Sequence, residues 1–207
     1  DIVIQNFKPG DAKQLKLDYK TLSKINPQII YGDIVGFEKG NPRAAFDVVL
    51  QAECGYMSMN GEKNAKPLKM PIAMIDVLAA HQMKEGLLCA LIKRMKTNLG
   101  SRVVVALYDA ALSTLTNQAT NWLMANSIPE AIGSEHPNIA PYGDLFQTED
   151  KKWIVLAVGS DRQFQNLCAT LGVDIYLDEK FSSNQSRVQN REELKVILAA
   201  KISHHSS

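Results

Sequence analysis

Apolar residues along the chain form short continuous runs and longer stretches with helical spacing. The runs at residues 1–4, 28–35 and 103–107 predict buried β-strands, and the middle one is rich in β-branched and aromatic residues. Apolar positions recur every three or four residues over 76–95, which predicts an amphipathic helix, and a second helix is predicted over 108–125. Strands that alternate with helices indicate βαβ units. We therefore predict an α/β fold with a mostly parallel sheet and flanking helices.

The pattern changes after Ser127. Residues 128–150 are rich in breakers and lack periodicity, which predicts a linker. Beyond it, residues 152–158 indicate a strand, and residues 161–171 indicate a helix that the chain enters through Gly159 and Ser160. We place the start of a smaller α+β domain here.

A last helix is predicted to start at Asn190 and to end near Lys201. Asn190 and Glu193 have the spacing of a capping box. Residues 203–207 are polar, and we expect no functional role for them.

Charge and cysteine content limit the possible partners. The 207 residues contain 23 Lys and Arg against 22 Asp and Glu, so a net charge of +1 does not favour binding to nucleic acid or to a membrane surface. No apolar stretch is long enough to cross a bilayer. The 3 cysteines are too far apart for a zinc site or a disulfide framework. We expect no metal and a cytoplasmic location, with the mitochondrial matrix as the alternative.

Asp76 is the most conspicuous polar residue, because it lies in the apolar segment PIAMIDVLAAHQM where the long helix is predicted to begin. One interpretation is that Asp76 is the N-cap of this helix. The other is that the helix amides hold an ionised carboxylate in an apolar pocket, where it is free to attack a carbonyl carbon. The two interpretations are compatible.

Several motifs in the chain resemble, in order and over nearly its whole length, the class III CoA-transferases of the CaiB/BaiF family. The motifs are DIVIQNFKPG at 1–10, KLDYKTLSKINPQIIYGDIVGF at 16–37, AFDVVLQAECGYMSMNGE at 45–62, YDAAL at 108–112, HPNIAPY at 136–142 and AVGSDRQFQNLC at 157–168.

This resemblance implies a domain organisation. Residues 1–127 would be the second half of a Rossmann-like large domain, 128–150 a linker, and 151–207 the start of the small domain. Family members are longer and form interlocked homodimers, so we expect this chain to be an internal fragment that is inactive alone.

The resemblance also implies a reaction. CoA would pass from an acyl-CoA donor to a carboxylic acid acceptor, with coenzyme A as co-substrate and no tightly bound cofactor. Asp76 matches the nucleophile of the family, which forms a mixed anhydride and then an aspartyl-CoA thioester. The HPNIAPY segment favours a dicarboxylate pair such as succinyl-CoA and a second short acid, and carnitine-like, oxalate-like or aromatic acceptors are the alternatives.

Binding residues follow from the same motifs. The resemblance places Asn6, Phe7, Lys13, Arg43 and Phe46 at the CoA site. The alternative is that these residues form an ordinary turn and a solvated surface.

One position in this region departs from the family. Gln14 stands where family members usually carry an arginine, and Lys8, Lys13 and Lys16 are the nearest substitutes for its charge.

Three further residues are assigned to the acid substrate by the resemblance: Gly55, Gly61 and His136. The alternative is that the glycines only mark turns and that His136 is an ordinary loop residue.

Phe46 bears on a second hypothesis. The related α-methylacyl-CoA racemases have a proton-transferring histidine at the position of Phe46. In this chain, Phe46 is followed by Asp47. Phenylalanine carries no exchangeable proton, which argues against a racemase. A third hypothesis is a non-catalytic CoA-binding module in which Asp76 is only a helix cap.

Overall fold

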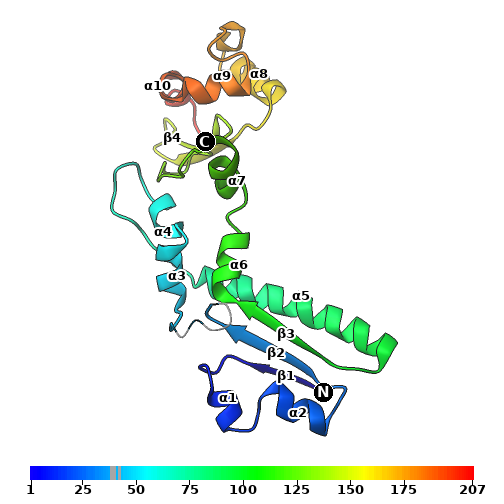
Figure 1. Cartoon of the computed structure of the whole chain (residues 1–207). Helices are drawn as coiled ribbons and strands as arrows, with labels where there is room; N and C mark the ends of the chain where they lie inside the picture. Colours follow the sequence, from blue (N-terminus) through cyan, green and yellow to red (C-terminus); the bar gives the residue numbers. More distant parts are fainter. Residues whose placement is uncertain (38–40, 42) are drawn as a thin grey trace. The chain divides into compact units, whose positions relative to one another are not determined.

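The computed structural model describes residues 1–37, 41 and 43–207, which form two compact units (Figure 1). The first unit comprises residues 1–60 and 66–130, and the second comprises residues 61–65 and 131–207. Each unit has its own β-sheet. The predicted domain boundaries at 127 and 151 stay predictions.

The first unit contains a three-stranded sheet in the order β1-β2-β3, in which both pairs of neighbours are parallel. The strands are β1 (Ile2–Gln5), β2 (Ile30–Val35) and β3 (Ser101–Ala106). Parallel strands require crossover connections, which here contain helices. The predicted α/β fold with a parallel sheet is therefore confirmed.

Seven helices accompany this sheet in the described residues of the first unit. They are α1 (Asp11–Gln14), α2 (Tyr19–Ile25), α3 (Asp47–Glu53), α4 (Tyr56–Met59), α5 (Met74–Thr97), α6 (Leu107–Ser113) and α7 (Thr116–Ala125).

The long helix α5 packs against β2 and β3. Two glycines let it approach closely: a Cβ at Gly86 would lie 2.5 Å from Cγ1 of Val103, and a Cβ at Gly32 would lie 2.7 Å from Sδ of Met83. The ring of Tyr31 points to the opposite face, where its hydroxyl donates to the carbonyl of Leu17 at 2.7 Å. Helices thus flank the sheet on both faces (Figure 1).

The single helix predicted over 108–125 is wrong. The structure has α6 and α7, separated at Thr114 and Leu115, and Thr116 has a φ of 45°. Tyr56 contributes to this break, because its hydroxyl donates to the carbonyl of Ala111 at 2.9 Å and lies 2.6 Å from Oγ1 of Thr114.

The second unit has a two-stranded antiparallel sheet made of β4 (Tyr142–Gln147) and β5 (Trp153–Ala157). Strand β4 falls inside the range predicted as a linker. Four helical segments accompany the sheet: α8 (Asp161–Thr170), η1 (Ile175–Leu177), α9 (Asn184–Gln189) and α10 (Arg191–Ile202). The core includes Phe146, Phe164, Phe181 and Leu198.

Of the two helix starts predicted in this unit, the one at Ser160 is correct and the capping box at Asn190 is wrong. Ser160 caps α8 and forms a capping box with Gln163, as expected for a helix entered there. The predicted box at Asn190 is absent, because the Asn190 side chain donates instead to the carbonyls of Ser186 and Lys180.

Arg187 lies fully buried in the core of the second unit. Its guanidinium donates to the carbonyls of Ala140 at 2.8 Å and Phe181 at 3.0 Å, and to Asp161 at 2.8 Å. It also stacks 4.4 Å from the centre of the Phe164 ring. Each of its three nitrogens has a partner, which offsets the cost of burying a charge.

Candidate functional site

The candidate site lies where the parallel strands end. β2 ends at Val35 and is followed by Phe37, which shares a buried cluster with Leu50 of α3, Ile75 of α5 and Ala111 of α6. This cluster brings the first turn of α5 to the carboxyl edge of the sheet. In open α/β sheets, this edge is the usual position of a ligand site.

Asp76 lies in the first turn of α5 and is exposed. The prediction that Asp76 is the N-cap is wrong, since Ala73 occupies that position and makes no side-chain cap. Neighbouring protein atoms still remove part of the hydration of the carboxylate. This loss of hydration and the nearby charge of Asp47 raise the pKa of the Asp76 carboxyl above its ordinary value.

Asp47 provides the helix cap that Ala73 lacks. One oxygen of its carboxylate accepts hydrogen bonds from the amides of Ile75 at 2.7 Å and Asp76 at 3.2 Å. These amides are two of the donors that the start of a helix leaves free. A side chain of α3 thus fixes the first turn of α5.

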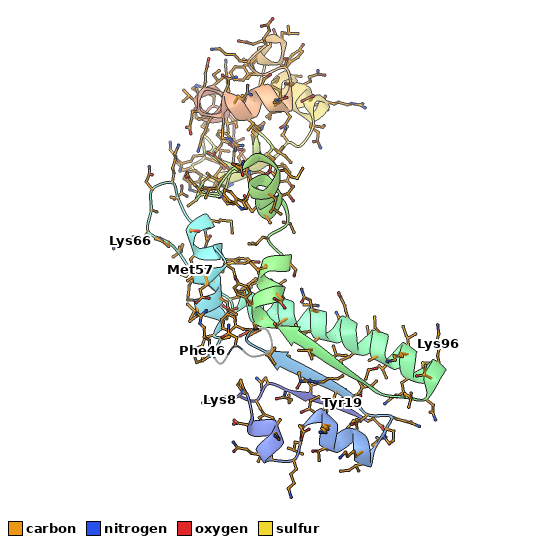
Figure 2. The ribbon with its side chains drawn as sticks, viewed as in Figure 1. Lys8, Tyr19, Phe46, Met57, Lys66 and Lys96 are labelled. Carbon is orange, nitrogen blue, oxygen red and sulfur yellow. The ribbon has the colours of Figure 1, made fainter. Side chains whose placement is uncertain are left out.

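The neighbourhood also holds a cation and aromatic rings. Arg43 forms an ion pair with Glu53, which raises the pKa of the guanidinium, and it stacks 4.7 Å from the centre of the Phe37 ring. Phe46 directly precedes α3 and is 66% exposed (Figure 2). The structure therefore places Arg43, Phe46 and Asp76, which were predicted from the sequence, around the same elements.

Asn6 and Phe7 directly follow β1 at the same edge of the sheet, and both are exposed. The amide of Phe7 donates to the side chain of Gln5 at 2.5 Å. Lys13 is exposed on the short helix α1, in agreement with a solvated position. The assignment of these three residues to CoA stays a prediction.

The residues assigned to the acid substrate are divided between the two units. Gly55 lies in the first unit and precedes α4 with a φ of 85°. Gly61 and His136 belong to the second unit. His136 packs edge-on against Tyr142, with ring centres 5.6 Å apart, and its Nδ1 accepts from the amide of Asn138 at 3.1 Å. Their assignment to the substrate stays a prediction.

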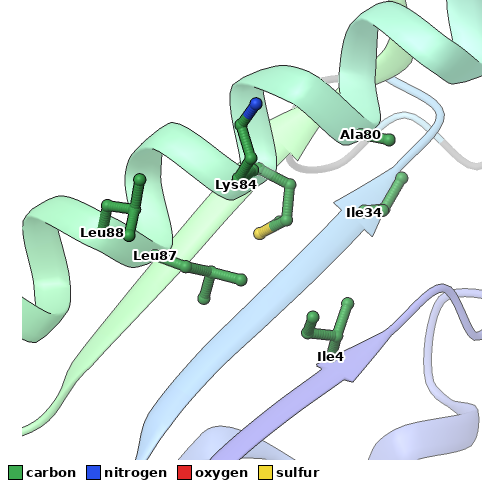
Figure 3. A pocket seen from close by; sticks show the side chains of 7 residues that line it. Ile4, Ile34, Ala80, Lys84, Leu87 and Leu88 are labelled. Atoms are coloured by element: carbon green, nitrogen blue, oxygen red, sulfur yellow. The ribbon is translucent and has the colours of Figure 1, made fainter.

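An apolar hollow of about 380 Å³ lies between α5 and the sheet (Figure 3). Ala80, one turn after Asp76, lines its near end, and Ile4 and Leu87 lie further along it. Asp76 itself is not among the lining residues. This hollow therefore does not provide the apolar enclosure expected around Asp76.

Gln51 is a residue of the site that the sequence did not reveal. It is 1% exposed, and its side chain bonds to Asp47 and to the segment before α5. The available signal was its spacing of four residues from Asp47, which puts both on one face of α3.

In the part of the chain that the structure describes, no group of three or more His, Cys, Asp or Glu is arranged to hold a metal ion. Over residues 1–37, 41 and 43–207, no helix is both long and apolar enough to span a membrane. Cys54 and Cys168 are buried, whereas Cys89 is exposed on α5.

Comparisons with known proteins identify relatives of the whole chain. The model of a family described as CoA-transferase family III matches residues 1–207. The chain is 36% identical to a succinate–glutarate CoA-transferase of Agrobacterium fabrum, over 97% of the chain and 51% of that protein. It is 38% identical to an acyl-CoA transferase of Fusarium pseudograminearum, over 96% of the chain and 44% of that protein. The chain thus spans about half the length of the curated relatives that it matches.

Solved structures give the same result. A CaiB/BaiF family protein of Brucella suis matches with a TM-score of 0.79 and 36% identity, over 100% of this chain and 55% of that one. A hypothetical protein of Mycobacterium tuberculosis matches with a TM-score of 0.85 and 27% identity, over 100% of this chain and 55% of that one.

Proposed function

The chain belongs to CoA-transferase family III, and from this premise we propose that the whole protein transfers CoA from an acyl-CoA to a carboxylic acid with Asp76 as the nucleophile. Asp76 is exposed at the carboxyl edge of the sheet. Its backbone amide donates a hydrogen bond to the carboxylate of Asp47. A carboxylate with a raised pKa is the stronger nucleophile of its kind, which supports this role.

The proposed reaction has four steps. The Asp76 carboxylate attacks the thioester carbonyl of the donor, the C–S bond breaks, and CoA leaves as a thiolate. The thiolate then attacks the aspartyl carbonyl of the anhydride and releases the donor acid. The acceptor carboxylate attacks the resulting aspartyl-CoA thioester and displaces the thiolate again. Attack of this thiolate on the acceptor carbonyl gives the new acyl-CoA and regenerates Asp76.

A dicarboxylate is the proposed acceptor. The relatives support this choice, since the Agrobacterium protein is named for succinate and glutarate, and the human and mouse relatives are named succinyl-CoA:glutarate CoA-transferases. This chain covers 51% of the Agrobacterium protein, 47% of the mouse protein and 46% of the human protein.

Phe46 supports transfer over racemisation. It directly precedes the aspartate that holds α5, and its ring can neither accept nor deliver a proton. A racemase needs a second general base at the substrate α-carbon. The interlocked homodimer and the cytoplasmic location stay predictions for the whole protein.

The proposed role of Asp76 is tested by isotope exchange in the full-length protein, with succinyl-CoA and ¹³C-labelled succinate. Asp76→Asn keeps the shape of the side chain but removes the nucleophile, so exchange should fall by at least about a thousandfold. Asp18→Asn is the matched control, because Asp18 caps α2 through Thr21 and does not bond to α5. Exchange retained in Asp76→Asn would refute the proposed function.

A further inference from the structure

Asp47 and Gln51, four residues apart on α3, control how α5 begins; together they are called the Asp47–Gln51 pair. Asp47 accepts from the amides of Ile75 and Asp76, 28 and 29 residues further along the chain. The other oxygen of Asp47 accepts from Nε2 of Gln51. Gln51 therefore fixes the orientation of the carboxylate that holds the first turn of α5.

Gln51 also holds the segment that leads into α5. Its Nε2 donates to the carbonyl of Ile72 at 3.3 Å, and its Oε1 accepts from the amide of Met70 at 2.8 Å. A side chain that is 1% exposed must satisfy its polar atoms inside the protein, and Gln51 does so with this segment. One face of α3 thus holds both the first turn of α5 and the segment that precedes it.

We propose that the Asp47–Gln51 pair positions Asp76 for nucleophilic attack and withholds from it the hydrogen bonds that a helix N-terminus normally donates. This inference rests on the proposed function of Asp76. Without Asp47, the amides of Ile75 and Asp76 would be free to donate to the Asp76 carboxylate, which would stabilise its charge and weaken it as a nucleophile.

The charge of Asp47 acts in the same direction as its hydrogen bonds. Partial loss of hydration is the larger cause of the raised pKa of Asp76, and the negative charge of Asp47 adds to it. The anion of Asp76 is therefore less stable and more reactive than that of an isolated aspartate. Asp47 and Gln51 touch neither the thioester nor CoA in this scheme, so they are positioning residues rather than catalytic ones.

The decisive variant is Asp47→Asn, which keeps an oxygen for the two amides but removes the charge and the oxygen that accepts from Gln51. Two quantities are measured: the pKa of Asp76, from the ¹³C shift of its carboxyl carbon during an NMR titration, and kcat and KM of CoA transfer by the full-length protein. We expect the pKa of Asp76 to fall, kcat to fall by roughly tenfold to a hundredfold, and KM for the acyl-CoA to stay within about twofold.

Gln51→Met is the second variant, because it removes the orienting bonds and keeps the charge of Asp47. We expect kcat to fall here too. Asp18→Asn again serves as the matched control, with circular dichroism to compare the folded state of all three. An Asp76 pKa that does not fall in Asp47→Asn, or transfer by both pair variants at the rate of the control, would overturn the proposal.

The two proposals fail separately. If Asp76→Asn retains exchange, Asp76 is not the nucleophile, although the titration still shows whether Asp47 controls its pKa. If Asp76→Asn abolishes exchange while the Asp47–Gln51 variants behave like the control, Asp76 is the nucleophile and the pair has no positioning role.

Discussion

Two neighbouring carboxylates at the start of α5 have opposite surroundings. Asp47 accepts two backbone hydrogen bonds and one from Gln51, whereas the amides nearest to Asp76 are taken by Asp47. One carboxylate, on α3, is therefore suited to holding structure, and the other, in the first turn of α5, is suited to reacting. This difference arises from contacts between α3 and α5 and not from the residue type.

The sequence could identify Asp76 but not its surroundings. Its position in an apolar segment and the family motifs both pointed to it. The N-cap interpretation failed because the actual cap comes from 28 residues upstream, and local spacing cannot reveal a partner at that distance. Gln51 was missed for the same reason, since its partners Met70 and Ile72 lie in an irregular segment.

Asp144 provides a test at this scale that is independent of the proposed reaction. It is 2% exposed, and its Oδ2 has no hydrogen-bond partner among the described residues. Burial, with a contribution from Glu135, raises the pKa of this carboxyl above its ordinary value, and Arg191 partly opposes the shift.

The sign of the pH effect follows from this raised pKa. The folded state favours protonated Asp144, so the contribution of this residue to stability is largest at low pH and falls as the pH rises through the folded-state pKa. Asp144→Asn should raise the free energy of unfolding at pH 7 by on the order of 1 kcal/mol, because a neutral group costs less to bury than a charge. The gain should vanish at low pH in thermal unfolding experiments.

Asp150→Asn is the control, because it should change stability at pH 7 in the opposite direction. Hydrogen bonds from Lys152 and Thr148 lower the pKa of Asp150, so its ionised form stabilises the fold. This variant should be less stable than the wild type at pH 7 and equal to it at low pH. An Asp144→Asn variant that loses stability at pH 7 would contradict the description of Asp144.

At the scale of elements, the apolar pattern predicted the strands and the long helix well. β1, β2, β3 and β5 lie within about two residues of their expected positions, and α5 extends the expected helix by two residues at each end. The strands are continuous apolar runs and α5 has apolar residues at helical spacing, and both signals are visible in the sequence.

The elements that the sequence missed lack such a period. α1 and α4 have four residues each, and β4 is interrupted by a register shift between Tyr142 and Leu145. The break between α6 and α7 contains neither Gly nor Pro, and it depends on contacts with Tyr56. The bounds of these elements depend on tertiary contacts, which local sequence patterns do not show.

Arg187 provides the test for the elements of the second unit, because it joins α9 to the start of α8 and to the carbonyl of Ala140. Arg187→Met leaves two buried carbonyls without a donor, so we expect a loss of about 3 kcal/mol in the free energy of unfolding. Urea unfolding followed by the fluorescence of Trp153, in a Trp122→Phe background, measures this loss in the second unit.

Arg162→Met is the matched control, since Arg162 lies exposed on α8. This variant should unfold within about 0.5 kcal/mol of the parent protein. Equal losses for Arg162→Met and Arg187→Met would show that the buried hydrogen bonds do not hold the unit together.

At the scale of the whole molecule, the chain combines a parallel α/β unit that carries Asp76 with a smaller unit that carries Gly61 and His136. The family could be inferred from the order of motifs, and the comparison over residues 1–207 confirms it. The division into units was visible only in part, because residues 61–65 join the second unit although they lie within the first half of the sequence. The amino-acid composition does not reveal that such a short segment packs with a distant part of the chain.

The most direct test of Asp76 is to trap the aspartyl-CoA intermediate in the full-length protein. Hydroxylamine attacks the aspartyl carbonyl of this thioester, releases CoA thiol and leaves a stable hydroxamate, which peptide mass spectrometry locates. After incubation with succinyl-CoA, the wild type and Asp18→Asn should carry the hydroxamate on Asp76, and Asp76→Asn should carry none. A hydroxamate on another residue, or CoA transfer without modification of Asp76, would contradict the proposal that Asp76 is the nucleophile.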